Sequence, residues 1–152
     1  MIVRAILSGP TSMPEATPGK MLRPGLVMFW FGTDLLYANA AFFKEKVRQL
    51  VDESPTPVRW LVVDASAITA IDSSAGRAVV ELHQDLAGQG IVLGASRVNR
   101  REGADFDRLG LAEVIGEEYI FGSWHEYIAA YESEMGGCKA VHAENKTRHN
   151  GD

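Results

Sequence analysis

The fold of this chain follows from one stretch, residues 61–76, which reads LVVDASAITAIDSSAG. The stretch opens with a short apolar run rich in β-branched residues, which is typical of a strand buried on both of its faces. Further along, apolar residues recur at steps of three and four, the spacing that places side chains on one side of a helix. These residues are Ala75, Ala78, Val79, Leu82 and Leu86. The sequence therefore predicts a strand, a short connection and a helix.

The start of this helix carries three polar residues in a row, Asp72, Ser73 and Ser74. Asp72 or Ser73 suits the N-cap position, because its side-chain oxygen accepts a backbone N–H of the first helical turn. The same helix end has partial positive charge and unpaired amides, which favour an anion or a phosphorylated hydroxyl. Two interpretations of Ser73 and Ser74 follow. They are helix-capping residues, or they accept a phosphoryl group as a switch.

A second group of residues with a functional interpretation is basic and follows the next predicted strand. Its members are Arg97, Arg100, Arg101 and Arg108. They form either an anion-facing patch or the solvated edge of a loop in which acidic residues alternate with them. Together with Asp72, Ser73 and Ser74, Arg97 would make a weak anion-binding site.

Composition limits the classes of protein that this chain represents. A length of 152 residues suits one domain, and 46% hydrophobic with 23% charged residues is ordinary for a globular protein. The net charge of −5 gives no basic footprint for nucleic acid. No apolar run reaches the roughly 18–20 residues of a membrane span, and the single cysteine, Cys138, forms no internal disulfide. We therefore expect a soluble, cytoplasmic domain that binds no nucleic acid.

Strands and helices alternate along most of the chain. We expect strands at 26–31, 58–64, 91–95 and 119–121, and helices at 39–51, 72–87, 105–109, 111–115 and 123–134. Asn39 is the expected N-cap of the first helix. Such alternation indicates an α/β fold with mostly parallel strands.

The two ends of the chain differ from this middle part in composition. Residues 1–24 contain four prolines and a brief apolar run, which indicates an edge strand followed by an irregular lead-in or linker. Residues 25–135 are expected to form the folded domain. From Gly136 the sequence is polar and aperiodic, so we expect residues 136–152 to be a disordered tail.

The sequence contains none of the motifs that mark the common catalytic sites. It has no phosphate-binding loop, no dinucleotide fingerprint and no Gly-x-Ser-x-Gly elbow. Its histidines and its cysteine lack the spacing of a zinc site. Asp64 and Asp72 are a conceivable pair of catalytic carboxylates, but loop solvation and helix capping explain both. We expect no enzymatic activity, no bound metal and no cofactor.

The order of these features resembles a STAS domain. The resemblance rests on Asp72-Ser73-Ser74 between a strand and a helix, on the strand Gly90-Ile91-Val92-Leu93, and on the later Leu109-Gly110-Leu111. It extends from residue 25 to residue 134, nearly the whole predicted domain. The family contains bacterial anti-sigma-factor antagonists and the cytoplasmic C-terminal domain of sulfate-permease (SulP) anion transporters. The fold it implies is a mixed, mostly parallel sheet of about five strands, with four or five helices packed largely on one side.

Within the family, the transporter branch is the more similar one. Its members resemble this chain at Tyr37-Ala38-Asn39-Ala40 and at Gly116-Glu117-Glu118-Tyr119-Ile120-Phe121. The antagonist branch has Gly-Leu-Gly after the serines of the turn, where this chain has Ala75-Gly76-Arg77. If the switch of the antagonists is retained, Ser73 is the residue that aligns with their phosphorylated serine.

The resemblance implies three alternative functions. The first is a regulatory domain of a SulP-type transporter, which docks on the membrane domain or on a second copy as a homodimer. The second is a free-standing antagonist that binds a kinase-type anti-sigma factor until Ser73 is phosphorylated. The third is binding of GTP or ATP near the Asp72 turn, with the Arg97 loop contributing.

Overall fold

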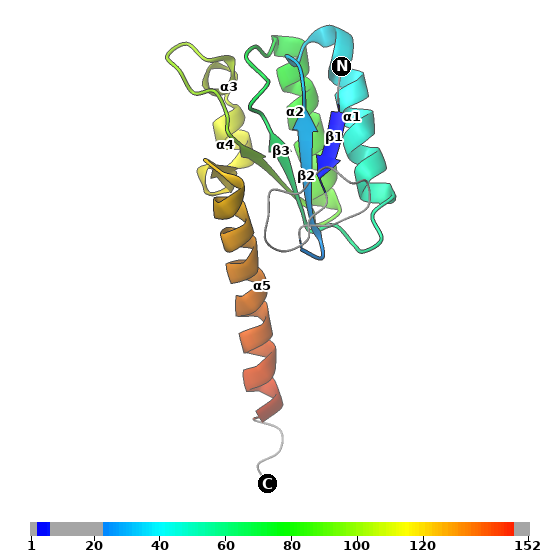
Figure 1. The fold of residues 1–152 in the computed structure, drawn as a ribbon, viewed down its shortest axis with the longest axis vertical. Helices are drawn as coiled ribbons and strands as arrows, with labels where there is room; N and C mark the ends of the chain where they lie inside the picture. Colours follow the sequence, from blue (N-terminus) through cyan, green and yellow to red (C-terminus); the bar gives the residue numbers. More distant parts are fainter. Residues whose placement is uncertain (1–2, 7–22, 148–152) are drawn as a thin grey trace.

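The computed structural model describes the backbone of residues 3–6 and 23–147 and the side chains of residues 23–136. The described strands form one five-stranded sheet in the order β1-β2-β3-β4-β5 (Figure 1). The strands are β1 (Val3–Ile6), β2 (Leu26–Phe31), β3 (Trp60–Asp64), β4 (Val92–Ser96) and β5 (Ile120–Phe121). β1 pairs with β2 in antiparallel fashion, whereas β2 to β5 are parallel. The predicted mixed, mostly parallel sheet is confirmed.

Helices connect the parallel strands. They are α1 (Tyr37–Asp52), α2 (Ser73–Gly88), α3 (Asp105–Arg108), α4 (Leu111–Ile115) and α5 (Trp124–Thr147), with a 3-10 turn at Glu117–Tyr119. Because consecutive strands are neighbours and such crossovers are right-handed, α1, α2 and α4 pack on the same face of the sheet. α5 packs on the opposite face and extends past the end of the sheet (Figure 1).

Alternating residues of the strands divide the core into two parts. In β2, Val27 and Phe29 belong to the larger core beneath α1 and α2, and Leu26 and Met28 belong to the smaller core beneath α5. This division follows from the two-residue period of a strand, and burial on both faces requires the continuous apolar runs that the sequence shows. The carboxyl ends of β2, β3 and β4 lie together at one edge, where their connections to the helices begin.

α5 covers the second face through a small aromatic cluster. Tyr127 and Tyr131 are buried against the sheet, with Tyr131 edge-on to Trp60. The Tyr127 hydroxyl donates to the sulfur of Met28 at 2.6 Å, and the Tyr131 hydroxyl donates to the carbonyl of Pro24. Burial raises the pKa of both phenols. These contacts hold α5 against the second face of the sheet.

Two expectations from the sequence differ from the structure. The prediction that Asn39 is the N-cap of α1 is wrong: the N-cap is Leu36, and the Asn39 side chain accepts the backbone N–H of Leu36 at 2.9 Å. The tail from Gly136 was expected to be disordered, but α5 continues through residues 136–147. The segment contains no proline, and Lys, Ala and Glu, which are good helix formers, make up five of its twelve residues. Residues 148–152 lie outside the described part.

Candidate functional site at the connection between β3 and α2

The predicted site residues Asp72, Ser73 and Ser74 lie where the β3–α2 connection enters its helix, at the carboxyl edge of the sheet. The β2–α1 loop runs alongside this connection. The N–H of Leu35 donates to the carbonyl of Ala70 at 3.0 Å, and the N–H of Asp72 donates to the carbonyl of Leu35 at 3.3 Å. The two loops are therefore joined through their backbones, like a short extension of the parallel sheet.

The Asp72 carboxylate caps two helices at once. One oxygen, Oδ1, accepts the N–H of Ala75 in the first turn of α2 at 2.8 Å. The other, Oδ2, accepts the N–H of Tyr37, the first residue of α1, at 2.7 Å. We call this arrangement the shared cap. It resolves the sequence alternative, because Asp72 is the N-cap of α2 and Ser73 is its first helical residue.

Two further carboxylates hold the backbone just before the shared cap. Asp34 accepts the hydroxyl and the N–H of Thr69 at 2.8 and 2.7 Å, and the N–H of Ala70 at 3.0 Å. Asp105 accepts the N–H of Ile71 at 2.9 Å. The hydrogen bond from the Thr69 hydroxyl is the largest cause that lowers the pKa of Asp34. The pKa of Asp105 is lowered first by its hydrogen bond from Arg108 and then by that from the Ile71 amide.

The surface above the shared cap combines apolar and hydroxyl side chains. Tyr37 is 78% exposed and Leu36 is 41% exposed, and they are the large apolar side chains exposed among residues 23–136. Ser73 and Ser74 are exposed as well, on the first turn of α2. We call these four residues the α1–α2 edge. It lies over two helix N-termini whose first turns carry no acidic side chain.

Arg97 contacts residues outside this edge through its side chain and its backbone. Its guanidinium pairs with the carboxylate of Asp64, which ends β3 and is only 3% exposed, and Asp64 also accepts the N–H of Ser66. The backbone of Arg97 has a φ of 53°, the left-handed region that is uncommon for a residue other than glycine. Its N–H donates to the carbonyl of Phe121, which ties it to β5. The contacts of Arg97 therefore belong to the end of the sheet, and those of Asp72 belong to the helix starts.

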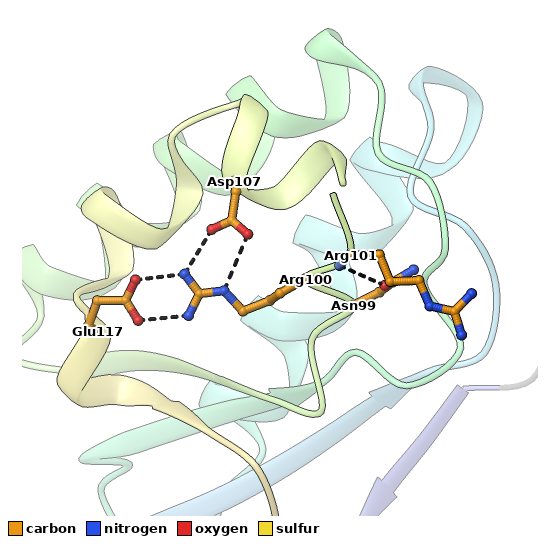
Figure 2. A network of polar contacts seen from close by, with 5 residues as sticks. All are labelled: Asn99, Arg100, Arg101, Asp107 and Glu117. Atoms are coloured by element: carbon orange, nitrogen blue, oxygen red, sulfur yellow. Dashed lines mark hydrogen bonds and ion pairs between the residues drawn. The ribbon is translucent and has the colours of Figure 1, made fainter. Parts of the chain in front are cut away.

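The other arginines of this loop are mostly paired with carboxylates. The Arg100 guanidinium binds Glu117 through two hydrogen bonds of 2.7 Å, and binds Asp107 at 2.8 and 3.3 Å (Figure 2). These hydrogen bonds raise the pKa of Arg100 and lower those of both carboxyls. Arg108 pairs with Asp105 at 2.7 Å. Figure 2 shows Arg101 pointing away from Arg100, and its backbone N–H donates to the Asn99 side chain. Most of the arginines that the sequence suggested for an anion-facing patch are therefore paired with carboxylates and are not available to bind an anion.

A small cavity of about 40 Å³ lies beneath the β3–α2 connection. Apolar side chains line it, among them Ile68 and Ile71 of the connection and Phe106 of α3. Such a lining offers no polar partner to the phosphates of GTP or ATP. The cavity therefore does not support the nucleotide alternative.

Within residues 23–136, no group of three or more His, Cys, Asp or Glu side chains is arranged to hold a metal ion. None of the described helices is long and apolar enough to cross a membrane.

Comparison with known proteins places these features in a family. A family model described as the STAS domain matches residues 20–126. A probable sulfate transporter of Mycobacterium tuberculosis is 33% identical to this chain over 98 residues, which is 64% of this chain and 18% of the transporter. The chain therefore spans less than a fifth of the curated relatives that it matches.

Solved structures share the fold. A sulfate transporter family protein from Wolinella succinogenes superposes with a TM-score of 0.62 at 20% identity, covering 78% of this chain and 94% of that one. A putative anti-sigma factor antagonist from Thermotoga maritima superposes with a TM-score of 0.56 at 17% identity, covering 70% of this chain and 86% of that one. At these identities the similarity shows the fold alone.

Proposed function

Because the chain belongs to the STAS-domain family, we propose that it is a non-catalytic regulatory domain of a SulP-type sulfate or anion transporter. The observation that carries this proposal is the sequence identity to probable sulfate transporters, of which this chain matches a segment of 18%. We place the domain at residues 25–135 and on the cytoplasmic face of the membrane.

In this proposal, the partner is the membrane domain of the transporter, and the docking surface is the α1–α2 edge. Exposed apolar side chains such as Leu36 and Tyr37 are the kind that interfaces bury, and aromatic residues often dominate binding energy. The helix N-termini beneath them already hold the Asp72 carboxylate, so the exposed apolar side chains, and not the charge of the helix ends, would supply the binding energy.

Binding to the membrane domain of a SulP-type transporter from the same source organism tests the proposal. That membrane domain would be held in nanodiscs and titrated with this chain. We expect Tyr37→Ser to weaken binding about tenfold or more, the size of an interface hot spot. Ala129→Ser, on an exposed position of α5, is the control and should bind like the wild type. Absence of binding by the wild-type chain would contradict the proposed function.

A second function, the phosphorylation switch of an anti-sigma-factor antagonist, is favoured by the position of Ser73. Its side chain is exposed at the first position of α2, where the helix dipole favours the negative charge of a phosphoryl group. A kinase-type anti-sigma factor would transfer the γ-phosphoryl group of ATP to the Ser73 hydroxyl and release ADP.

Intact-mass measurement after incubation with such a kinase and ATP tests this second function. The switch predicts one added phosphoryl group in the wild type and in Ser74→Ala, and none in Ser73→Ala. An unmodified wild-type chain, beside a kinase that modifies a known antagonist in the same assay, would count against the switch.

A further inference from the structure

We propose that a negative charge placed on Ser73 is transmitted to α1 through the shared cap and loosens the start of that helix. The inference deepens the second function above, since it says how modification of Ser73 would change the docking surface. It rests on that function only for the identity of the modified residue. The transmission itself is a property of this chain and is testable without a kinase.

The first step concerns the position of Asp72 next to Ser73. The two residues are neighbours in the chain, and both carboxylate oxygens of Asp72 already hold an N–H, one in each helix. A like charge so close destabilises the ionised carboxylate and repels it. Since the two oxygens belong to one rigid carboxylate, a rotation that relieves this repulsion changes both hydrogen bonds.

The second step is an asymmetry between the two helices. A new anion at the first position of α2 can itself accept the amides at that helix end, so α2 keeps a cap. The N–H of Tyr37 has no acceptor other than Asp72 among the described residues. The N-cap residue of α1, Leu36, has no side-chain acceptor to offer. The loss therefore falls on α1.

The third step limits the change to the first turn of α1. Asn39 stays attached, because its side chain accepts the N–H of Leu36 and donates to the carbonyl of Asp34 at 2.8 Å. Further along, Phe43 and Val47 fix the helix in the larger core. The residue left to move is Tyr37, the most exposed apolar side chain of the α1–α2 edge, because Asn39 holds the backbone of Leu36. The proposed device thus converts a charge on α2 into a changed apolar surface on α1.

Amide hydrogen exchange, resolved to single residues by NMR, tests the device on the full chain. Ser73→Asp supplies the charge, and we expect the Tyr37 amide to exchange about tenfold faster, as fits the loss of a hydrogen bond to a charged group. Ser66→Asp is the matched control, because the Ser66 side chain is exposed in the same connection and its backbone N–H donates to the Asp64 carboxylate. This control should leave Tyr37 unchanged.

Asp72→Asn supplies the second comparison. It should accelerate exchange at Tyr37 by itself, and adding Ser73→Asp to it should produce little further change. An unchanged Tyr37 amide in Ser73→Asp would overturn the proposal, as would equal acceleration in Ser66→Asp. A full effect of Ser73→Asp in the Asp72→Asn background would also overturn it. A failed kinase assay with a positive exchange result would reject the switch function and keep the device.

Discussion

Two neighbouring connections at the carboxyl edge of the sheet are held by different interactions. In the β3–α2 connection, the carboxylates of Asp34, Asp72 and Asp105 accept backbone N–H groups. In the β4–α3 connection, the Arg100 guanidinium binds carboxylates of exposed side chains. The first arrangement fixes the backbone and leaves outward side chains such as Ser73 available. In the second arrangement, the charged side chains are themselves occupied in ion pairs with one another.

This difference explains which connection is suited to a partner. A surface whose backbone is already held by hydrogen bonds loses little conformational entropy on binding, because its outward side chains are already in position. A loop whose arginines are paired with carboxylates must break those pairs before it binds an anion. In the proposed function, docking therefore falls to the α1–α2 edge, while the Arg100 network holds its own loop.

The largest effect in this comparison is expected from Asp72→Ala. The substitution removes a helix cap and leaves the N–H of Tyr37 without its acceptor, so the free energy of unfolding should fall by about 2 kcal/mol. Urea unfolding followed by circular dichroism measures this change, with Ser66→Ala as the control. A loss below about 0.5 kcal/mol, the range of ordinary surface substitutions, would contradict the shared cap.

The next largest effect is expected from acid, which should weaken the β3–α2 connection. The pKa values of Asp34 and Asp105 are lowered in the folded state, so their stabilisation is complete above the unfolded-state pKa of about 3.9 and is lost as the pH falls through the lowered values. Asp34→Asn should lower stability at neutral pH and flatten its decline below about pH 4. Urea midpoints over that pH range provide the measurement. An equally steep decline in Asp34→Asn would show that Asp34 is not involved.

Arg100→Gln should have a smaller effect that depends on salt. The side chains of Arg100 and its two partners are partly exposed, and exposed ion pairs contribute little. We expect a small decrease in thermal midpoint at low salt, and none relative to wild type near 1 M NaCl, where the screening length is about 3 Å. A decrease that persists in high salt would indicate that packing of the Arg100 side chain is responsible.

Ser74→Ala should have the smallest effect. The cap of α2 is Asp72, and alanine is the better helix former, so the stability should change by less than about 0.5 kcal/mol. A larger decrease in the free energy of unfolding, measured in the same urea assay, would indicate that Ser74 does cap the helix.

Local sequence patterns predicted the strands and the helix after Asp72, and they limited its N-cap to Asp72 or Ser73, because neighbouring residues decide these features. They did not predict the start of α1, since the acceptor of the Tyr37 amide lies 35 residues away in Asp72. The pairing of Arg100 with Glu117 spans 17 residues and also depends on the assembled fold. The sequence did contain one signal for such long-range contacts. Asp34 and Asp64 each lie at or just after the end of a strand, and residues at those positions meet at the same edge of a parallel sheet.

The most direct test of the central proposal is the size and location of the native protein that carries this domain. An antibody raised against the domain would be used to probe membrane and cytosolic fractions of the source cells. The transporter proposal predicts a membrane-bound band several times heavier than the 16.6 kDa of this chain. A band of the size of this chain in the cytosol alone would contradict it and favour the soluble switch.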